Sequence, residues 1–175
     1  MPTRVKTLII TDPTGGAGMS PEEEADFIAR YMAEMYGIVL NYVHSTAAQS
    51  LKEVQPHLVI LDYGGASIGY GDTGYHQIEY VLKWAEDHPS KLVLIYSLFT
   101  TWMVHEIQED IEPLDNVLFW DPSDKEYRRS LPWDERDKHQ NELALKIRHW
   151  YDLPEPDGTI DEGQIDDLIT PGRIP

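Results

Sequence analysis

The chain of 175 residues contains no cysteine, which excludes disulfide bonds, thiolate metal sites and cysteine nucleophiles. It also lacks an apolar run long enough to span a bilayer. The first residues lead directly into a strand-like segment, without the apolar core of a signal peptide. We therefore expect a cytoplasmic protein that does not contact a membrane.

Basic side chains are scarce: 14 lysines and arginines stand against 31 acidic residues, for a net charge of −17. Such a surface repels a polyphosphate backbone over a screening length of roughly 8 Å at physiological salt. The charge argues against direct nucleic-acid binding and is compatible with another protein, a metal ion or a small ligand as partner. The acidity can equally serve solubility alone, and the sequence leaves the oligomeric state open.

What the chain does contain is a regular alternation between strand-like and helix-like periodicity. The expected strands cover residues 5–10, 38–43, 58–61, 92–96 and 117–120. The expected helices cover residues 21–36, a short segment after residue 45, about 78–88, 101–111 and about 134–151. Ser20 and Gly37 are suited to cap the first of these helices at its two ends.

Strands and helices in alternation favour a parallel sheet with helices on both faces, because crossover connections are right-handed. We predict an α/β fold of one doubly wound, five-stranded parallel sheet in the order 2-1-3-4-5, which is flavodoxin-like. This domain should span residues 1–151. Residues 152–175 are rich in proline, glycine and acidic residues and form a C-terminal extension without a core of its own.

The candidate site lies where the predicted strands end. The apolar run Leu58–Leu61 delivers Asp62 into a glycine-rich loop that begins with Gly64 and Gly65. In open α/β sheets the ligand crevice lies beyond the carboxyl ends of the strands. Asp12, Ser97 and Asp121 follow three other strands and should converge on the same edge.

This pattern resembles the receiver domain of two-component response regulators, over residues 5–151. The resemblance implies a phosphoacceptor role for Asp62, with Mg²⁺ bound by Asp12. It also implies that Ser97 contacts the phosphoryl group. Pro122 matches the proline that follows the fifth strand in that family.

The chain departs from that family at the position of its lysine, which here is Asp121. Replacing a cation by a carboxylate in a phosphoryl site costs several kcal/mol where the site is partly buried. Lys125, in the only tight basic cluster of the chain, could fold back and supply the missing cation. A solvated loop charge is the simpler interpretation. The phosphorylation site is therefore interpreted as incomplete.

Three functions remain open at this stage. The first is a receiver-like module that binds a protein or responds to a ligand, and the second is a Mg²⁺-dependent phosphoacceptor on Asp62. The third is a small metal-dependent or nucleotide-binding enzyme that uses the same edge, where Asp12, Asp62 and Asp121 could hold Mg²⁺ as oxygen ligands. Residues 12–18 are similar to the N-terminal loop of hydroxymethylpyrimidine kinases, and residues 69–73 are similar to the anion-hole motif of ribokinase-type enzymes, which keeps the nucleotide alternative open.

Overall fold

A computed structural model describes residues 4–11, 18–62, 73–96, 111–120 and 145–153. The strands are β1 (Arg4–Ile10), β2 (Val39–Ser45), β3 (Leu58–Asp62), β4 (Leu92–Tyr96) and β5 (Val117–Trp120). The helices are α1 (Pro21–Tyr36), the single 3₁₀ turn η1 (Ala48–Ser50), α2 (Leu51–Val54) and α3 (Thr73–Asp87). Residues 145–151 are also helical. The predicted segments 101–110, 134–144 and 154–175 lie outside the described residues.

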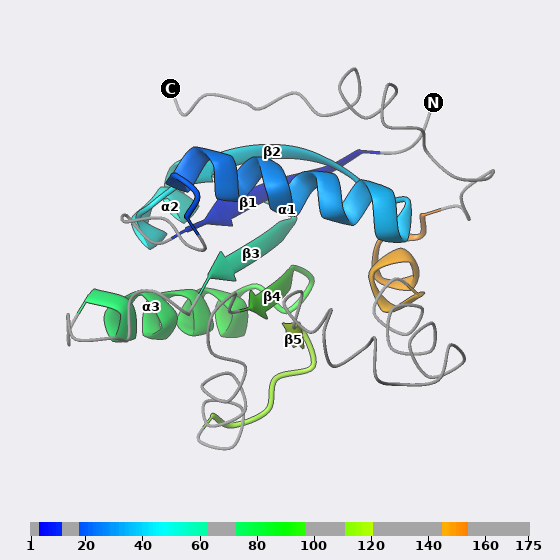
Figure 1. Ribbon diagram of the computed structural model, residues 1–175. Helices are drawn as coiled ribbons and strands as arrows, with labels where there is room; N and C mark the ends of the chain where they lie inside the picture. The colour runs from blue at the N-terminus through cyan, green and yellow to red at the C-terminus, as the bar shows by residue number, and fades with distance from the viewer. Residues whose placement is uncertain (1–3, 12–17, 63–72, 97–110, 121–144, 154–175) are drawn as a thin grey trace, which may run out of the picture.

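The five strands form one sheet in the order β2-β1-β3-β4-β5, and every neighbouring pair is parallel (Figure 1). This confirms the predicted fold class, which is a flavodoxin-like α/β fold. All five residues of β3 and all five of β4 are buried, as expected for strands covered on both faces.

The register brings the carboxyl ends of the strands to one edge of the sheet. Ile10 pairs with Leu61, Asp62 pairs with Tyr96, and Tyr96 pairs with Trp120. The last residues of β1, β3, β4 and β5 therefore lie at the same edge of the sheet, which we call the carboxyl edge.

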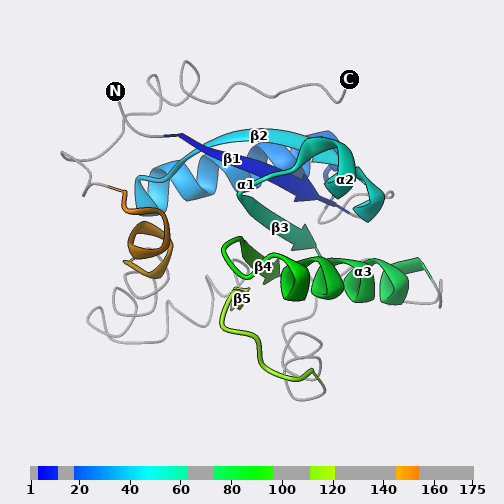
Figure 2. The same ribbon diagram turned by 180° about the vertical axis from the view of Figure 1, so that it is seen from behind.

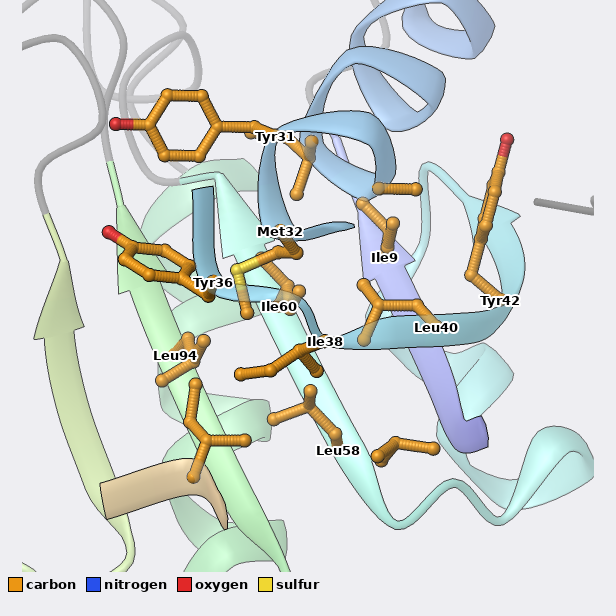
Figure 3. Close-up of a cluster of buried hydrophobic side chains, with 14 of the residues drawn as sticks. Ile9, Tyr31, Met32, Tyr36, Ile38, Leu40, Tyr42, Leu58, Ile60 and Leu94 are labelled. Atoms are coloured by element: carbon orange, nitrogen blue, oxygen red, sulfur yellow. The ribbon is translucent and has the colours of Figure 1, made fainter. Parts of the chain in front are cut away.

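Side chains of the strands divide between two apolar cores, one on each face. Viewed from the two opposite directions of Figures 1 and 2, α1 covers one face, and α2 and α3 cover the other. The core beneath α1 includes Ile9, Ile60 and Leu94, which neighbour one another across β1, β3 and β4 (Figure 3). Alternation along each strand sends successive side chains to opposite cores.

Helix α1 begins and ends where its sequence predicts. Ser20 precedes Pro21, and its hydroxyl oxygen accepts a hydrogen bond from the backbone N–H of Glu23 at 3.2 Å. Gly37 has a φ of 64°, and its N–H donates to the carbonyl oxygen of Ala33 at 3.0 Å, which closes the helix in the left-handed conformation. These caps fix which residues of α1 face the sheet.

The helix of residues 145–151 is tied to the body at three points. Arg148 donates to the carbonyl oxygen of Tyr36, and Tyr151 donates to that of His57. The indole N–H of Trp150 donates to the carbonyl oxygen of Ser90 at 2.9 Å. Ile147 is fully buried in the core beneath α1.

Strand β2 ends two residues later than predicted. The predicted second strand stops at Val43, whereas β2 continues to Ser45. The reason is pairing: Ile10 lies opposite Ser45, and the N–H of Thr11 donates to the carbonyl oxygen of Ser45 at 3.0 Å. His44 is therefore a strand residue whose orientation the sheet fixes.

Candidate functional site at the carboxyl edge

Five polar side chains gather at the carboxyl edge on the face covered by α1. Four lie at the carboxyl ends of β2, β1, β3 and β4, where Thr11 directly follows β1, and each comes two positions after a residue of the core beneath α1. The fifth belongs to the first turn of α1. We call them the edge cluster: His44, Thr11, Asp62, Tyr96 and Glu24. Four of the five are buried, and His44 is half-buried. A buried polar group carries a high desolvation cost unless it is paired, so we take the cluster as the candidate site.

Glu24 and Tyr96 form the centre of the edge cluster. Both side chains have 0% exposure, and the hydroxyl of Tyr96 donates to Oε1 of Glu24 at 3.1 Å. Hydrogen bonds to a charged acceptor are stronger than those between neutral groups. This bond links the end of β4 to the first turn of α1.

Asp62 lies beside Tyr96 on the same edge and is 6% exposed. Burial raises the pKa of Tyr96 well above its ordinary value of 10.0, and the nearby carboxylates of Asp62 and Glu24 raise it further. Two carboxylates thus act on a single phenol. The phenol remains protonated at neutral pH and can donate its hydrogen.

Thr11 and His44 form the second pair of the edge cluster. Oγ1 of Thr11 lies 2.7 Å from Nε2 of His44, and Thr11 is 1% exposed. Burial lowers the pKa of His44 below 6.5, and the charge of Glu22 opposes that shift without reversing it. The imidazole is therefore neutral at neutral pH and can exchange a hydrogen bond with the hydroxyl in either direction.

The lowered pKa of His44 predicts a pH-dependent stability. An unfolded histidine binds a proton near pH 6.5, whereas the folded one does so only at lower pH, so stability falls as pH drops from 6.5 towards the folded pKa. Replacing His44→Gln should make the free energy of unfolding less dependent on pH between 7.5 and 5. Urea unfolding across this range measures the slope. The exposed His149→Gln variant is the control and should keep the wild-type slope; equal slopes in all three chains would contradict the assignment.

Of the residues predicted from sequence for the site, the structure describes Asp62, at the end of β3. Asp62 pairs with Tyr96, which in turn pairs with Trp120, and Leu61 pairs with Ile10 of β1. Tyr96 and Trp120 directly precede the predicted site residues Ser97 and Asp121. The remaining predicted site residues lie outside the described part of the chain: Asp12, Gly64, Gly65, Ser97, Asp121 and Lys125.

Of the residues predicted to bind a metal ion, the structure describes only Asp62. Among the described residues, no three histidine, aspartate or glutamate side chains come together in a way that could hold a metal ion. Two of the three predicted ligands, Asp12 and Asp121, lie outside the described ranges.

Within the described ranges the structure has no helix that is long and apolar enough to cross a membrane.

Sequence reasoning missed four members of the edge cluster. In the sequence, Glu24 looks like an exposed acid of the first helical turn. It nevertheless lies four and eight residues before Ile28 and Met32, and so on the buried face of α1. In the sequence, Tyr96 looks like a core residue of a buried strand. It is the last residue of β4 and therefore lies at the carboxyl edge. The helix stripe gives a usable signal for Glu24. His44 and Thr11 give none, because the extra strand pairing that orients them is a tertiary feature.

No protein-family profile matches the chain, and neither does any curated protein. Three solved structures are similar over most of its length. A family 3 carbohydrate esterase from Clostridium thermocellum is 14% identical with a TM-score of 0.48, covering 86% of this chain and 98% of its own.

Two further solved structures cover a similar share of the chain. The signal receiver domain of a protein described as a Luxo repressor, from Vibrio parahaemolyticus, is 16% identical with a TM-score of 0.41, over 86% of this chain and 96% of its own. A protein described as lipolytic, of the G-D-S-L family, from Desulfitobacterium hafniense, is 17% identical with a TM-score of 0.43, over 82% and 99%. At such identities these similarities assign no activity.

Proposed function

We propose that the chain is a receiver-like module that responds to a ligand at the carboxyl edge and passes the response to another protein, without being phosphorylated itself. The supporting observation is the buried position of Asp62 at the end of the central strand, beside Tyr96, whose hydroxyl donates to Glu24. In open α/β sheets, ligands bind beyond the carboxyl ends of the strands, which is where Asp62 lies. The carboxylate of Asp121, which stands at the position of the lysine in receiver domains, disfavours a phosphoryl group.

A divalent cation is the first ligand to test. Mg²⁺ prefers carboxylate oxygens, and the predicted ligands Asp12, Asp62 and Asp121 all belong to the carboxyl edge by sequence. A cation bound there would offset the repulsion between the acidic side chains. Binding that reorders the edge would also reach α1, because Tyr96 connects the two.

Thermal unfolding with and without Mg²⁺ tests this proposal. A cation at ten times its dissociation constant stabilises the native state by about 1.4 kcal/mol, and we expect this gain for the unaltered chain. Asp62→Asn should abolish it, and Asp115→Asn, which changes an exposed aspartate in the same way, should not. A Mg²⁺ effect that survives in Asp62→Asn would contradict the role of Asp62.

The absence of phosphorylation is tested separately. Incubation with acetyl phosphate and Mg²⁺, followed by intact-mass measurement, should leave the mass unchanged. A stable gain of one phosphoryl group that is lost in Asp62→Asn would instead favour the phosphoacceptor function.

A further inference from the structure

Two lysines and a histidine lie side by side near the amino ends of β1, β3 and β4, at the edge of the sheet opposite to the carboxyl edge. We call them the amino-edge row: Lys6, His57 and Lys91. The N–H of His57 donates to the carbonyl oxygen of Lys6 at 2.9 Å, so these two residues are neighbours across β1 and β3. The ammonium Nζ of Lys91 lies 2.8 Å from Nδ1 of His57.

The three side chains belong to one face of the sheet. Each member of the row comes two positions before a residue of the core covered by α2 and α3, and side chains alternate along a strand. These core residues are Leu8, Val59 and Val93. Lys6 and His57 are exposed and Lys91 is half-buried, so a ligand can reach the row from solvent.

The contact between Lys91 and His57 fixes which ring nitrogen carries the hydrogen. An ammonium group can only donate, so Nδ1 of His57 accepts and the hydrogen of the neutral ring lies on Nε2. Partial desolvation lowers the pKa of His57 below 6.5, and the positive charges of Lys91 and Lys6 lower it further. At neutral pH the row therefore presents two ammonium groups and one imidazole N–H, all of them hydrogen-bond donors.

The backbone that carries the row is held by the rest of the fold. The side-chain amide of Asn116, which is 4% exposed, donates to the carbonyl oxygen of Lys91 at 2.9 Å and to that of Ala85 at 2.8 Å. The hydroxyl of Tyr151 donates to the carbonyl oxygen of His57. Because the attachment points are fixed, a ligand would have to order only the ends of the side chains.

We propose that the amino-edge row binds a phosphate group, either as free phosphate or as the phosphate of a small ester. Phosphate carries several acceptor oxygens, which suits neighbouring cationic and N–H donors. The net charge of −17 repels anions from the chain as a whole, so binding requires such a local group of donors. Exposed Asp115, two residues before Val117 of β5, bounds the row on the side of Lys91.

This site is separate from the carboxyl edge and goes beyond the proposed function. Its test is a titration with inorganic phosphate at pH 7.5 and constant ionic strength, followed by ¹H–¹⁵N NMR of the imidazole of His57. We expect a saturable shift of the Nε2 signal in the unaltered chain. Lys6→Gln and Lys91→Gln should each weaken binding about fivefold, as expected for an exposed ion pair, and the double variant should show no saturation.

Lys146→Gln is the matched control, because it removes an exposed lysine from the helix of residues 145–151, away from the row. It should bind phosphate like the unaltered chain, and circular dichroism confirms that each variant is folded. A second titration with phenyl phosphate distinguishes the two sources: tighter binding than that of inorganic phosphate indicates an ester, and equal or weaker binding indicates free phosphate. Either result supports the site.

The absence of a saturable shift in the unaltered chain would overturn the inference. Equal dissociation constants in the unaltered chain, Lys6→Gln and Lys91→Gln would overturn it as well, because the shift would then come from elsewhere. Neither outcome affects the proposed function, whose tests depend on Asp62 at the opposite edge of the sheet.

Discussion

Shortening Ile60 to alanine should lower the free energy of unfolding by about 2–5 kcal/mol. Ile60 is fully buried in the central strand and lies between Ile9 and Leu94 in register, both also fully buried. The substitution removes three carbons from a core covered by α1 (Figure 3), and close-packed neighbours only partly fill the space that remains. Urea unfolding at pH 7 measures the loss.

Leu145→Ala is the matched control. Leu145 is an aliphatic residue with 57% exposure on the helix of residues 145–151, and its truncation should cost no more than about 0.5 kcal/mol. Similar losses in the two variants would contradict the central position of β3. This position matters because β3 carries Asp62 to the carboxyl edge.

Replacing Tyr96 with phenylalanine should cost about 1.5–3 kcal/mol at pH 7, the usual contribution of a hydrogen bond to a charged group. The variant deletes the hydroxyl that donates to Glu24 and leaves the buried ring in place. Tyr80→Phe removes a hydroxyl from a half-buried position on α3 and should cost about 0.5 kcal/mol or less.

The same variant has a signature at alkaline pH. The pKa of Tyr96 lies well above 10.0 in the folded chain, so its contribution to stability is complete below pH 10 and is lost as pH rises further. The unaltered chain should therefore lose stability above pH 10 more steeply than Tyr96→Phe does. Burial raises the pKa of Tyr42 to about 12 as well, and the variant should retain the part of the slope that this residue causes. Identical slopes above pH 10 would contradict the assignment to Tyr96.

The fold was largely predictable because its signals are local. Segments such as Leu58–Asp62 and Leu92–Tyr96 are short apolar runs typical of buried parallel strands. Ser20 and Gly37 mark the ends of α1 by their own conformational preferences. Strict alternation of strands and helices then leaves few topologies, and the observed order is among them.

The candidate site was less predictable because it depends on contacts between distant segments. Tyr96 and Glu24 are 72 residues apart, and Thr11 and His44 are 33 apart. A sequence shows that a carboxylate follows a strand, but it does not show which helix turn lies above it. Predictions based on strand ends therefore included Asp62 and omitted Glu24, the helix residue that accepts the hydroxyl hydrogen of Tyr96.

The most direct test of a ligand site at the carboxyl edge is a Mg²⁺ titration followed by ¹H–¹⁵N NMR of the full chain. We predict saturable shifts of the amide signals of Thr11, Glu24, Asp62 and Tyr96, with little change at the opposite edge of the sheet, for example at Leu92. The Asp62→Asn variant should show none of these shifts. Unchanged spectra of the unaltered chain, or the same shifts in Asp62→Asn, would contradict the account.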